Sequence, residues 1–394
     1  VNGAGASTAL YAGAPETAQF AQINIGALTG TGIITNSSAT QTTVSLGGTA
    51  TTGTTTFGGA LQDGLGMLNV VINGTSARSQ AILGAQSYTG VTVINTGNLA
   101  VTSLADGGIA SGLGASSNAA SNLIFNGGAL TYTGAAAAGA TTGGGIYQTT
   151  QTPSVSTNRL FLMAGNATIR SSGTYGNESA AAGTGANNAS LIWSNTGDLQ
   201  FVNAGARTLT LGGTSTGDNE MRIRLRNNPN ANEALSLTKA DAGLWILNPL
   251  TSNDYTGATT ISGGALRALT SGSVLGISAN SLITINGGVL ETSGIFNRTL
   301  GAAAGNVQLT GGASGFAAAT TDRLVVTLGG GGLTWGSATF APTSLVLGSS
   351  TALGETEITN DINLSGASRT ITVNNNGNTG TMVTAGILSG VISN

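Results

Sequence analysis

Short runs of alternating apolar and polar residues, separated by glycine and asparagine, dominate this chain. One run at 91–94 is followed by a turn at 95–97 and a second run at 98–101. Successive side chains of a strand point to opposite faces, so Ile94 and Leu99 are expected on one apolar face. Few stretches place apolar residues three and four positions apart without an intervening glycine. The pattern therefore predicts an all-β chain of short strands.

A strand-like phrase recurs three times at nearly constant spacing. It occupies 42–46, 207–211 and 369–373, so that successive copies start 165 and 162 residues apart. The tripeptide Tyr-Thr-Gly recurs in the same way, at 88–90 and at 255–257. Self-similarity at a fixed period is the sequence signature of a solenoid, in which each unit buries its apolar face against its neighbours. We therefore predict a β-solenoid with one coil about every 20 residues.

The repeats also predict how the chain is divided. We expect a single continuous β-helix over residues 1–394. Its internal units are predicted at about 42–206 and 207–368, with a partial unit at 369–394. The chain begins at Val1 and stops in the middle of the pattern, which indicates a fragment of a longer chain.

The joints between strands carry glycine and asparagine. Asn-Gly-Gly at 126–128 and at 286–288 is expected to supply the positive backbone dihedrals of a sharp corner, since glycine has no side chain and asparagine tolerates the left-handed region. Two longer joints, 135–153 and 173–188, are low in apolar alternation and are predicted to be inserted loops. Insertions of this kind are where solenoids place binding loops when they have them.

Composition supports a narrow solenoid interior and excludes two other classes of chain. There are 64 Gly and only 5 Pro in 394 residues, with 40% hydrophobic and 4% aromatic residues. The chain is too apolar for a disordered linker and has too few large side chains for a compact globular core. The side chains expected in the apolar column include those of Ile261, Leu266, Ile285 and Leu290. Arg267 is expected outside it.

Charge and residue usage exclude several kinds of site. Charged residues make up 7% of the chain and the formal net charge is −3, so neither nucleic acid nor an anionic membrane surface is expected as a partner. The chain has no Cys and no His, which excludes disulfides, thiolate metal sites and any Ser-His or Cys-His relay. No run approaches the ~20 apolar residues of a membrane-spanning helix. Neither a cofactor, nor a metal, nor a membrane span is therefore expected.

Two segments carry a family resemblance. Residues 237–247 and 253–266 resemble the autotransporter-associated β-strand repeat, which occurs in passenger regions of Gram-negative surface proteins. The similarity is close over about 237–269 and looser over 66–134 and 282–301. The resemblance implies a right-handed parallel β-helix that is displayed or released outside the cell, with an adhesive or structural role. It implies no enzyme, because the repeat is a scaffold without catalytic residues.

A row of arginines is the first candidate for ligand binding. In the segment 221–226, Arg222, Arg224 and Arg226 alternate with apolar residues. They are expected on one face of a strand, about 7 Å apart, and a guanidinium group binds carboxylates and sulfates through two parallel hydrogen bonds. An acidic polysaccharide would fit this row. The alternative is a solvated strand face over an apolar inner row.

A pair of acids is a weaker candidate. Glu355 and Glu357 are expected on one strand face, with Asp361 nearby. They are loosely similar to the carboxylate clusters of β-helical polysaccharide hydrolases and lyases. Such acids need a groove and partners from adjacent coils, and the alternative is isolated surface charge.

The sequence thus predicts an extracellular structural or adhesive β-helix segment, such as a surface stalk, a matrix fibre or part of an adhesin, without catalysis of its own. Its expected partners are copies of itself, through end-to-end or lateral association into filaments, or cell-surface and matrix glycans. The alternatives are a polysaccharide-binding or polysaccharide-degrading β-helix and a phage-type tail fibre or spike. The expected location is extracellular or at the cell surface, associated with a Gram-negative outer membrane or secreted.

Overall fold

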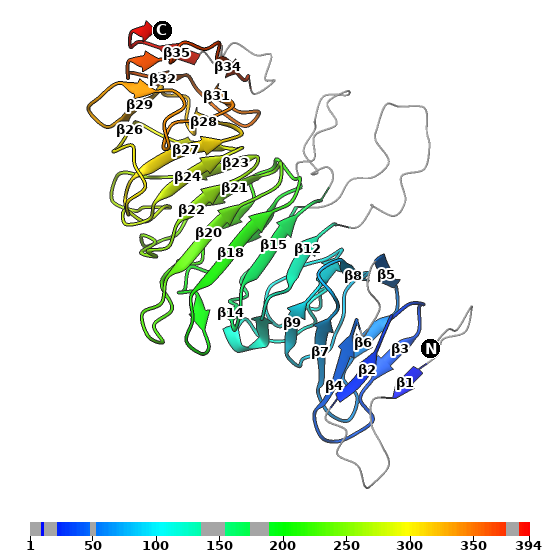
Figure 1. The fold of residues 1–394 in the computed structure, drawn as a ribbon. Coiled ribbons are helices and arrows are strands. Elements are labelled where there is room, and N and C mark those ends of the chain that lie inside the picture. The colour runs from blue at the N-terminus through cyan, green and yellow to red at the C-terminus, as the bar shows by residue number, and fades with distance from the viewer. Residues whose placement is uncertain (1–8, 12–21, 48–52, 135–153, 174–188, 376–385) are drawn as a thin grey trace, which may run out of the picture. The chain divides into compact units, whose positions relative to one another are not determined.

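Strands joined by turns make up nearly all of the structure (Figure 1). The computed structural model describes residues 9–11, 22–47, 53–134, 154–173, 189–375 and 386–394. Within these residues the helical structure is one 3-10 turn, η1 (Ala120–Asn122), so the prediction of an all-β chain is confirmed. The chain divides into two compact units, unit 1 with Val1–Asn203 and Gly213–Asp218, and unit 2 with Ala204–Gly212 and Asn219–Asn394.

The described strands of unit 1 pair in parallel, each with the equivalent strand of the next coil. One series is β1 (Ala9–Tyr11), β3 (Ile33–Thr35) and β6 (Ala60–Gln62). A second is β2 (Gln22–Ile25), β4 (Thr42–Leu46), β7 (Leu68–Asn73), β9 (Thr92–Thr96), β11 (Leu123–Phe125), β14 (Leu162–Met163) and β17 (Gln200–Phe201). A third is β5 (Gly53–Phe57), β8 (Arg78–Ile82), β10 (Asn98–Val101), β12 (Ala129–Tyr132) and β15 (Ala167–Ser171), and β13 (Val155–Thr157) pairs with β16 (Leu191–Trp193).

Unit 2 is built in the same way. One series is β18 (Arg207–Gly212), β20 (Leu235–Lys239), β22 (Thr259–Ile261), β24 (Ile283–Asn286) and β27 (Val307–Gly311). The longest is β19 (Glu220–Met221), β21 (Leu244–Leu247), β23 (Ala265–Ala268), β25 (Val289–Thr292), β28 (Ala313–Ala318), β31 (Ser344–Leu347) and β34 (Thr370–Val373). The others are β26 (Ile295–Arg298), β29 (Leu324–Leu328), β32 (Thr356–Ile358) and β35 (Gly386–Leu388), and β30 (Leu333–Thr334), β33 (Ile362–Asn363) and β36 (Ile392–Ser393).

Parallel pairing between strands that are one turn of the chain apart defines a parallel β-helix. Each unit has this architecture, so the predicted fold class is confirmed. Thr210, Thr238, Thr260 and Thr284 are register partners on successive coils, at intervals of 28, 22 and 24 residues. These coils are longer than the predicted repeat of about 20 residues, because turns of unequal length separate the strands.

The core of unit 1 is a column of like residues stacked in register. Leu46, Ile72, Ile94, Phe125 and Met163 are successive partners in one series of strands, and all are buried. Stacking removes each side chain from water on both sides. Full burial of a large apolar side chain stabilises the folded state by about 1.5–3 kcal/mol relative to leaving it exposed. The column is therefore held by apolar burial as well as by the backbone ladder.

Unit 2 repeats this arrangement with its own residues. Ile261 and Ile285 are register partners in one series, and Leu266 and Leu290 are partners in another. All four are fully buried, whereas the side chain of Arg267 keeps 16% exposure on the outer side. The predicted division into an apolar column and an outer face is confirmed at these positions.

The Asn-Gly-Gly corners differ in part from the prediction. Gly127 and Gly287 have φ values of 110° and 108°, as expected for a corner that favours glycine. The asparagines of these corners do not take positive φ, so that part of the prediction is wrong. Instead Asn126 donates through Nδ2 to Oδ1 of Asn95 at 3.2 Å, and Asn95 donates likewise to Asn73 at 3.2 Å. At the first corner the asparagine thus belongs to a side-chain ladder between coils.

Several predictions about domains stay predictions. The inserted loops expected at 135–153 and 173–188 lie outside the described residues, apart from Gly173. The repeat boundaries and the continuity of the β-helix through the whole chain also stay predictions. Among the described residues, no helix has the length and apolar character needed to cross a membrane.

Candidate functional site

The recurring Tyr-Thr-Gly phrase marks a contact between successive coils. Its tyrosines, Tyr88 and Tyr255, are buried, and their phenol oxygens share hydrogen bonds of 2.7 Å with the hydroxyls of Thr92 and Thr259. Burial raises the pKa of both tyrosines to about 12. Each phenol therefore stays neutral inside the column.

The threonine of the phrase binds a side chain from the preceding coil. The hydroxyl of Thr89 donates to Oδ2 of Asp63 at 2.5 Å, and the Thr89 N–H donates to the same oxygen at 3.1 Å. In unit 2 the amide of Asn227 takes the place of the carboxylate. It accepts from the Thr256 N–H at 2.9 Å and donates to the Thr256 hydroxyl at 2.9 Å. The same docking contact is thus made by two different residue types.

The glycine of the phrase is required by close approach of the backbone. A Cβ atom on Gly90 would lie 2.3 Å from the carbonyl oxygen of Leu68. A Cβ atom on Gly257 would lie 2.3 Å from the carbonyl oxygen of Leu235. Carbon and oxygen atoms that are not bonded do not approach this closely, so any larger residue must push the two coils apart.

A buried carboxamide two positions before the tyrosine completes the contact. Oε1 of Gln86 accepts from the Leu61 N–H at 2.6 Å, and Oδ1 of Asn253 accepts from the Leu225 N–H at 2.7 Å. Sequence reasoning missed this residue because the two units use side chains of different length. The signal was the presence of a carboxamide at the same offset in both copies. The motif is therefore Gln/Asn-x-Tyr-Thr-Gly. Its carboxamide, threonine and glycine contact another coil, and its tyrosine is buried and hydrogen-bonded to a threonine four positions later.

An arginine lies near each of these tyrosines, and Arg159 is buried whereas Arg298 is half-buried. Arg159 donates through Nη2 to the Gly114 carbonyl oxygen at 2.9 Å, and Arg298 donates through Nη1 to the Ser281 carbonyl oxygen at 2.8 Å. Burial lowers the pKa of both guanidinium groups from the ordinary value. Backbone carbonyl groups, rather than a carboxylate, thus satisfy these two internal charges.

The predicted arginine row lies beyond the end of a strand. The strand β19 stops at Met221, so the expected strand over 221–226 is shorter than predicted. Arg222, Arg224 and Arg226 are partly exposed, and the apolar residues between them are buried. The predicted alternation of outer arginines and inner apolar residues is therefore present without a regular strand.

Two of these arginines are paired with acids. Nε of Arg222 is in direct contact with Oε2 of Glu220. Arg224 lies 2.7 Å from Oδ2 of Asp254 through Nη2, and it donates through Nε to the Ser252 carbonyl oxygen at 3.0 Å. An acidic glycan would have to compete with these carboxylates, and its binding here stays a prediction.

The two acids at 355 and 357 are held by one arginine. Arg323 places Nη2 2.9 Å from Oε2 of Glu355 and Nη1 3.2 Å from Oε2 of Glu357. Asp361 accepts the N–H of Val391 at 2.6 Å. Across the described ranges, no three acidic side chains gather closely enough to hold a metal ion. The two glutamates are thus held by one guanidinium group from another coil.

An outer face of unit 2 carries a column of hydroxyl groups. Thr210, Thr238, Thr260 and Thr284 are successive register partners, and all are partly exposed. The column continues at Gln308, whose Nε2 donates to the Thr284 hydroxyl at 3.0 Å. We call these five residues the threonine column. Unequal coil lengths hide it in the sequence.

A groove of about 450 Å³ lies beside the ends of β21 and β23. Its walls include Leu247, Pro249, Leu250 and Leu269, and Arg267 borders it. Leu250 is 72% exposed and Leu269 is 45% exposed. The groove offers apolar contact, but the guanidinium beside it is already paired, as described below.

Comparison with known proteins identifies the repeat. The family model of the passenger-associated transport repeat matches residues 81–101 and 237–268. Both matches contain the Gln/Asn-x-Tyr-Thr-Gly motif. The family model therefore covers the docking motif of both units.

One curated relative is the adhesin BmaC autotransporter of Brucella suis biovar 1 (strain 1330). It is 39% identical over 182 residues, which is 46% of this chain and 4% of the relative. The chain thus spans a small part of the length of that protein. No solved structure matches this chain.

Proposed function

We propose that this chain, which matches the passenger-associated transport repeat over residues 81–101 and 237–268, serves as an adhesive and structural segment of an autotransporter passenger. It is located outside the cell, either secreted or exposed at the outer-membrane surface. The coils provide a scaffold on which side chains are repeated at the spacing of strands. Adhesion then depends on outer rows of side chains and not on a single pocket.

The threonine column is the observation that carries the proposal. It presents uncharged hydrogen-bonding groups on five successive coils, about 4.8 Å apart along the stack. Each hydroxyl can donate one hydrogen bond and accept two. Cell-surface and matrix glycans present hydroxyl groups along an extended chain, so they are the ligand class that fits such a row.

We also propose that the segment has no catalysis of its own. The acidic candidates support this, because Glu355 and Glu357 share the guanidinium of Arg323. A general acid or base must reach its substrate, whereas both of these carboxylates are engaged by one guanidinium group. A hydrolase or lyase would release oligosaccharides from a polysaccharide incubated with the purified segment. We expect no release.

Binding of the purified segment to immobilised neutral glycans, sulfated glycans and matrix-coated surfaces tests the adhesive proposal. The variant Thr238→Glu/Thr260→Glu places two charges in the threonine column. It is expected to weaken glycan binding about tenfold or more, because a bound ligand would remove the carboxylates from water without supplying a partner for them. The matched control is Thr327→Glu, an outer residue of β29 that is partly exposed as well. Equal binding by both variants, or no binding by the unmodified segment, would contradict the proposal.

Self-association into filaments is the second part of the proposal. Among the described residues, β34, β35 and β36 each pair with one neighbouring strand, and Val391 beside β36 is 67% exposed. Where such an edge is uncovered, its backbone groups can pair with a strand of another copy. The sedimentation coefficient of the segment should then increase with protein concentration. Val391→Lys/Ile392→Lys should reduce this increase. A single monomeric species at every concentration would count against this part.

A further inference from the structure

The turn that follows β31 lies back across the outer face of its own sheet. We call residues Ser349–Gly354 the strap. Ala352 of the strap is fully buried in a cluster with Val289, Ala317 and Val346, which stand on β25, β28 and β31. The strap therefore covers apolar side chains from three successive coils.

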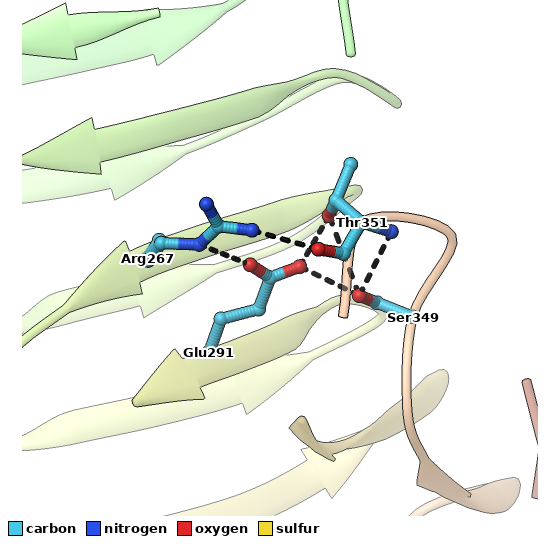
Figure 2. A network of polar contacts seen from close by, with 4 residues as sticks. All are labelled: Arg267, Glu291, Ser349 and Thr351. Atoms are coloured by element: carbon cyan, nitrogen blue, oxygen red, sulfur yellow. Dashed lines mark hydrogen bonds and ion pairs between the residues drawn. The ribbon is translucent and has the colours of Figure 1, made fainter. Parts of the chain in front are cut away.

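The strap also binds a buried carboxylate, as Figure 2 shows. The side chain of Glu291 on β25 is fully buried, and its Oε1 accepts from the Ser349 hydroxyl at 2.6 Å and from the Thr351 hydroxyl. Its Oε2 lies 2.7 Å from Nε of Arg267 on β23. Arg267 then donates through Nη2 to the carbonyl oxygen of Thr351 at 2.7 Å. The strap is thus joined to both members of an ion pair.

Small residues make room for the strap. Arg267, Glu291 and Ala317 are register partners in one outer row, so the row changes from two long charged side chains to a methyl group at β28. The strap occupies the space that this methyl group leaves. Its Leu353 N–H donates to the carbonyl oxygen of Ala318 at 2.9 Å, which fixes it over β28.

These contacts reach across coils that do not pair with each other. The sheet order is β23, β25, β28 and β31, and the strap connects the end of β31 to side chains on β25 and β23. In a solenoid each coil contacts only its neighbours, so coils can open one after another. A link that passes over β28 adds a coupling that the backbone ladder lacks.

We propose that the strap is a lock that makes the coils of β23, β25, β28 and β31 open together. If β31 opened alone, the strap would leave with it. Glu291 would then lose both hydroxyl donors to Oε1 and keep only its ion pair with Arg267, and leaving a buried charged oxygen without its hydrogen bonds is unfavourable. Opening one coil therefore requires the others to open as well. For a surface protein, such a lock resists stepwise unravelling.

Hydrogen exchange of the purified segment tests the lock. In the unmodified protein the amides of β23, β25, β28 and β31 should exchange as one kinetic unit. In Ser349→Ala/Thr351→Ala the amides of β31 should exchange about tenfold or more faster, whereas those of β23 keep their rate. The matched control is Arg323→Gln, which removes exposed ion pairs in a different sheet. It should change the exchange rate of the β31 amides by less than about threefold.

Two results of that experiment would overturn the proposal. One is an unchanged rate for β31 in Ser349→Ala/Thr351→Ala. The other is an equal acceleration of all strands, β18 and β20 included, because this indicates general destabilisation without uncoupling.

Thiol labelling supplies an independent measurement, because the chain contains no Cys. In Ala352→Cys the labelling rate reports how often the strap opens, since Ala352 is fully buried and its side chain is not one of the hydrogen-bonding groups of the lock. The lock requires labelling and exchange of β31 to report the same opening equilibrium within about threefold. Labelling that is about tenfold or more faster than exchange would show a strap that lifts on its own, and would contradict the lock.

Discussion

Lys239 and Ile261 are register partners on two successive coils, and both point into the column of unit 2. Lys239 is the only lysine of the chain and is fully buried. Its Nζ donates to three backbone carbonyl oxygens, those of Ala240 at 2.6 Å, Asp241 at 2.9 Å and Gly263 at 3.0 Å. A charged group therefore occupies a position that the alternation pattern reserves for an apolar side chain.

The buried lysine predicts a stability that rises with pH above 8. Burial lowers the pKa of Lys239 from 10.5 to about 8. Between these values the unfolded chain holds the proton and the folded chain does not, so the free energy of unfolding increases with pH, by about 3 kcal/mol at most. Denaturant unfolding at pH 7.5, 9 and 10 measures this, with Lys239→Met as the control. Parallel pH profiles for the two proteins would refute it.

Substitutions on the two faces of the strands should differ greatly. Ile285→Lys places a charge without a partner in the apolar column and is expected to cost about 4 kcal/mol or more, or to prevent folding. Thr260→Lys changes a partly exposed outer residue and should cost about 0.5 kcal/mol or less. Thermal and denaturant unfolding of both variants measures the difference. Similar losses would mean that the assignment of inner and outer faces is wrong.

The glycine of the docking motif should not tolerate a methyl group. In Gly257→Ala the added Cβ would meet the Leu235 carbonyl oxygen, and we expect a loss of about 1–3 kcal/mol in the free energy of unfolding. Gly331→Ala is the control, because a Cβ there meets no atom within 4 Å. If the two variants unfold at the same denaturant concentration, the close approach is not a constraint.

The arginine row predicts a graded response to sulfated glycans. Asp254→Asn removes a carboxylate that competes with the ligand for Arg224, and it should strengthen binding of heparin severalfold. Arg222→Gln/Arg224→Gln/Arg226→Gln should abolish salt-sensitive binding, whereas Arg323→Gln should leave it unchanged. Surface plasmon resonance at two salt concentrations separates these effects. If none of these substitutions changes the affinity for heparin, the arginine row is not the binding site.

The face assignments could be predicted from sequence because they depend only on alternation. Ile261, Ile285, Leu266 and Leu290 are inner residues in the structure for the same reason that they are inner residues in the pattern. Lys239 also lies at an inner position of the alternation, but a lysine is not expected in an apolar column, so the sequence pattern does not reveal it as an inner residue. The partners of its ammonium group are backbone carbonyl groups, which leave no trace in residue types.

The contacts between distant residues could not be predicted. The hydroxyl of Ser349 reaches Glu291 across 58 residues, and this depends on the path of a turn and on the small size of Ala317. Arg267 had been expected to be a simple outer residue, and the ion pair with Glu291 makes its replacement costly as well. Register between coils of unequal length is needed to see such pairs, and the sequence alone does not supply it.

Register is thus the central claim, because the threonine column, the docking motif and the strap all depend on it. Register partners of adjacent parallel strands lie about 4.8 Å apart, within the Cα separation of about 4.4–6.8 Å that a disulfide bridges. The most direct measurement is disulfide formation in Thr260→Cys/Thr284→Cys, compared with the shifted pair Thr260→Cys/Leu282→Cys. We predict rapid and complete oxidation in the first protein and little in the second. Equal oxidation in both, or preference for the shifted pair, would contradict the account.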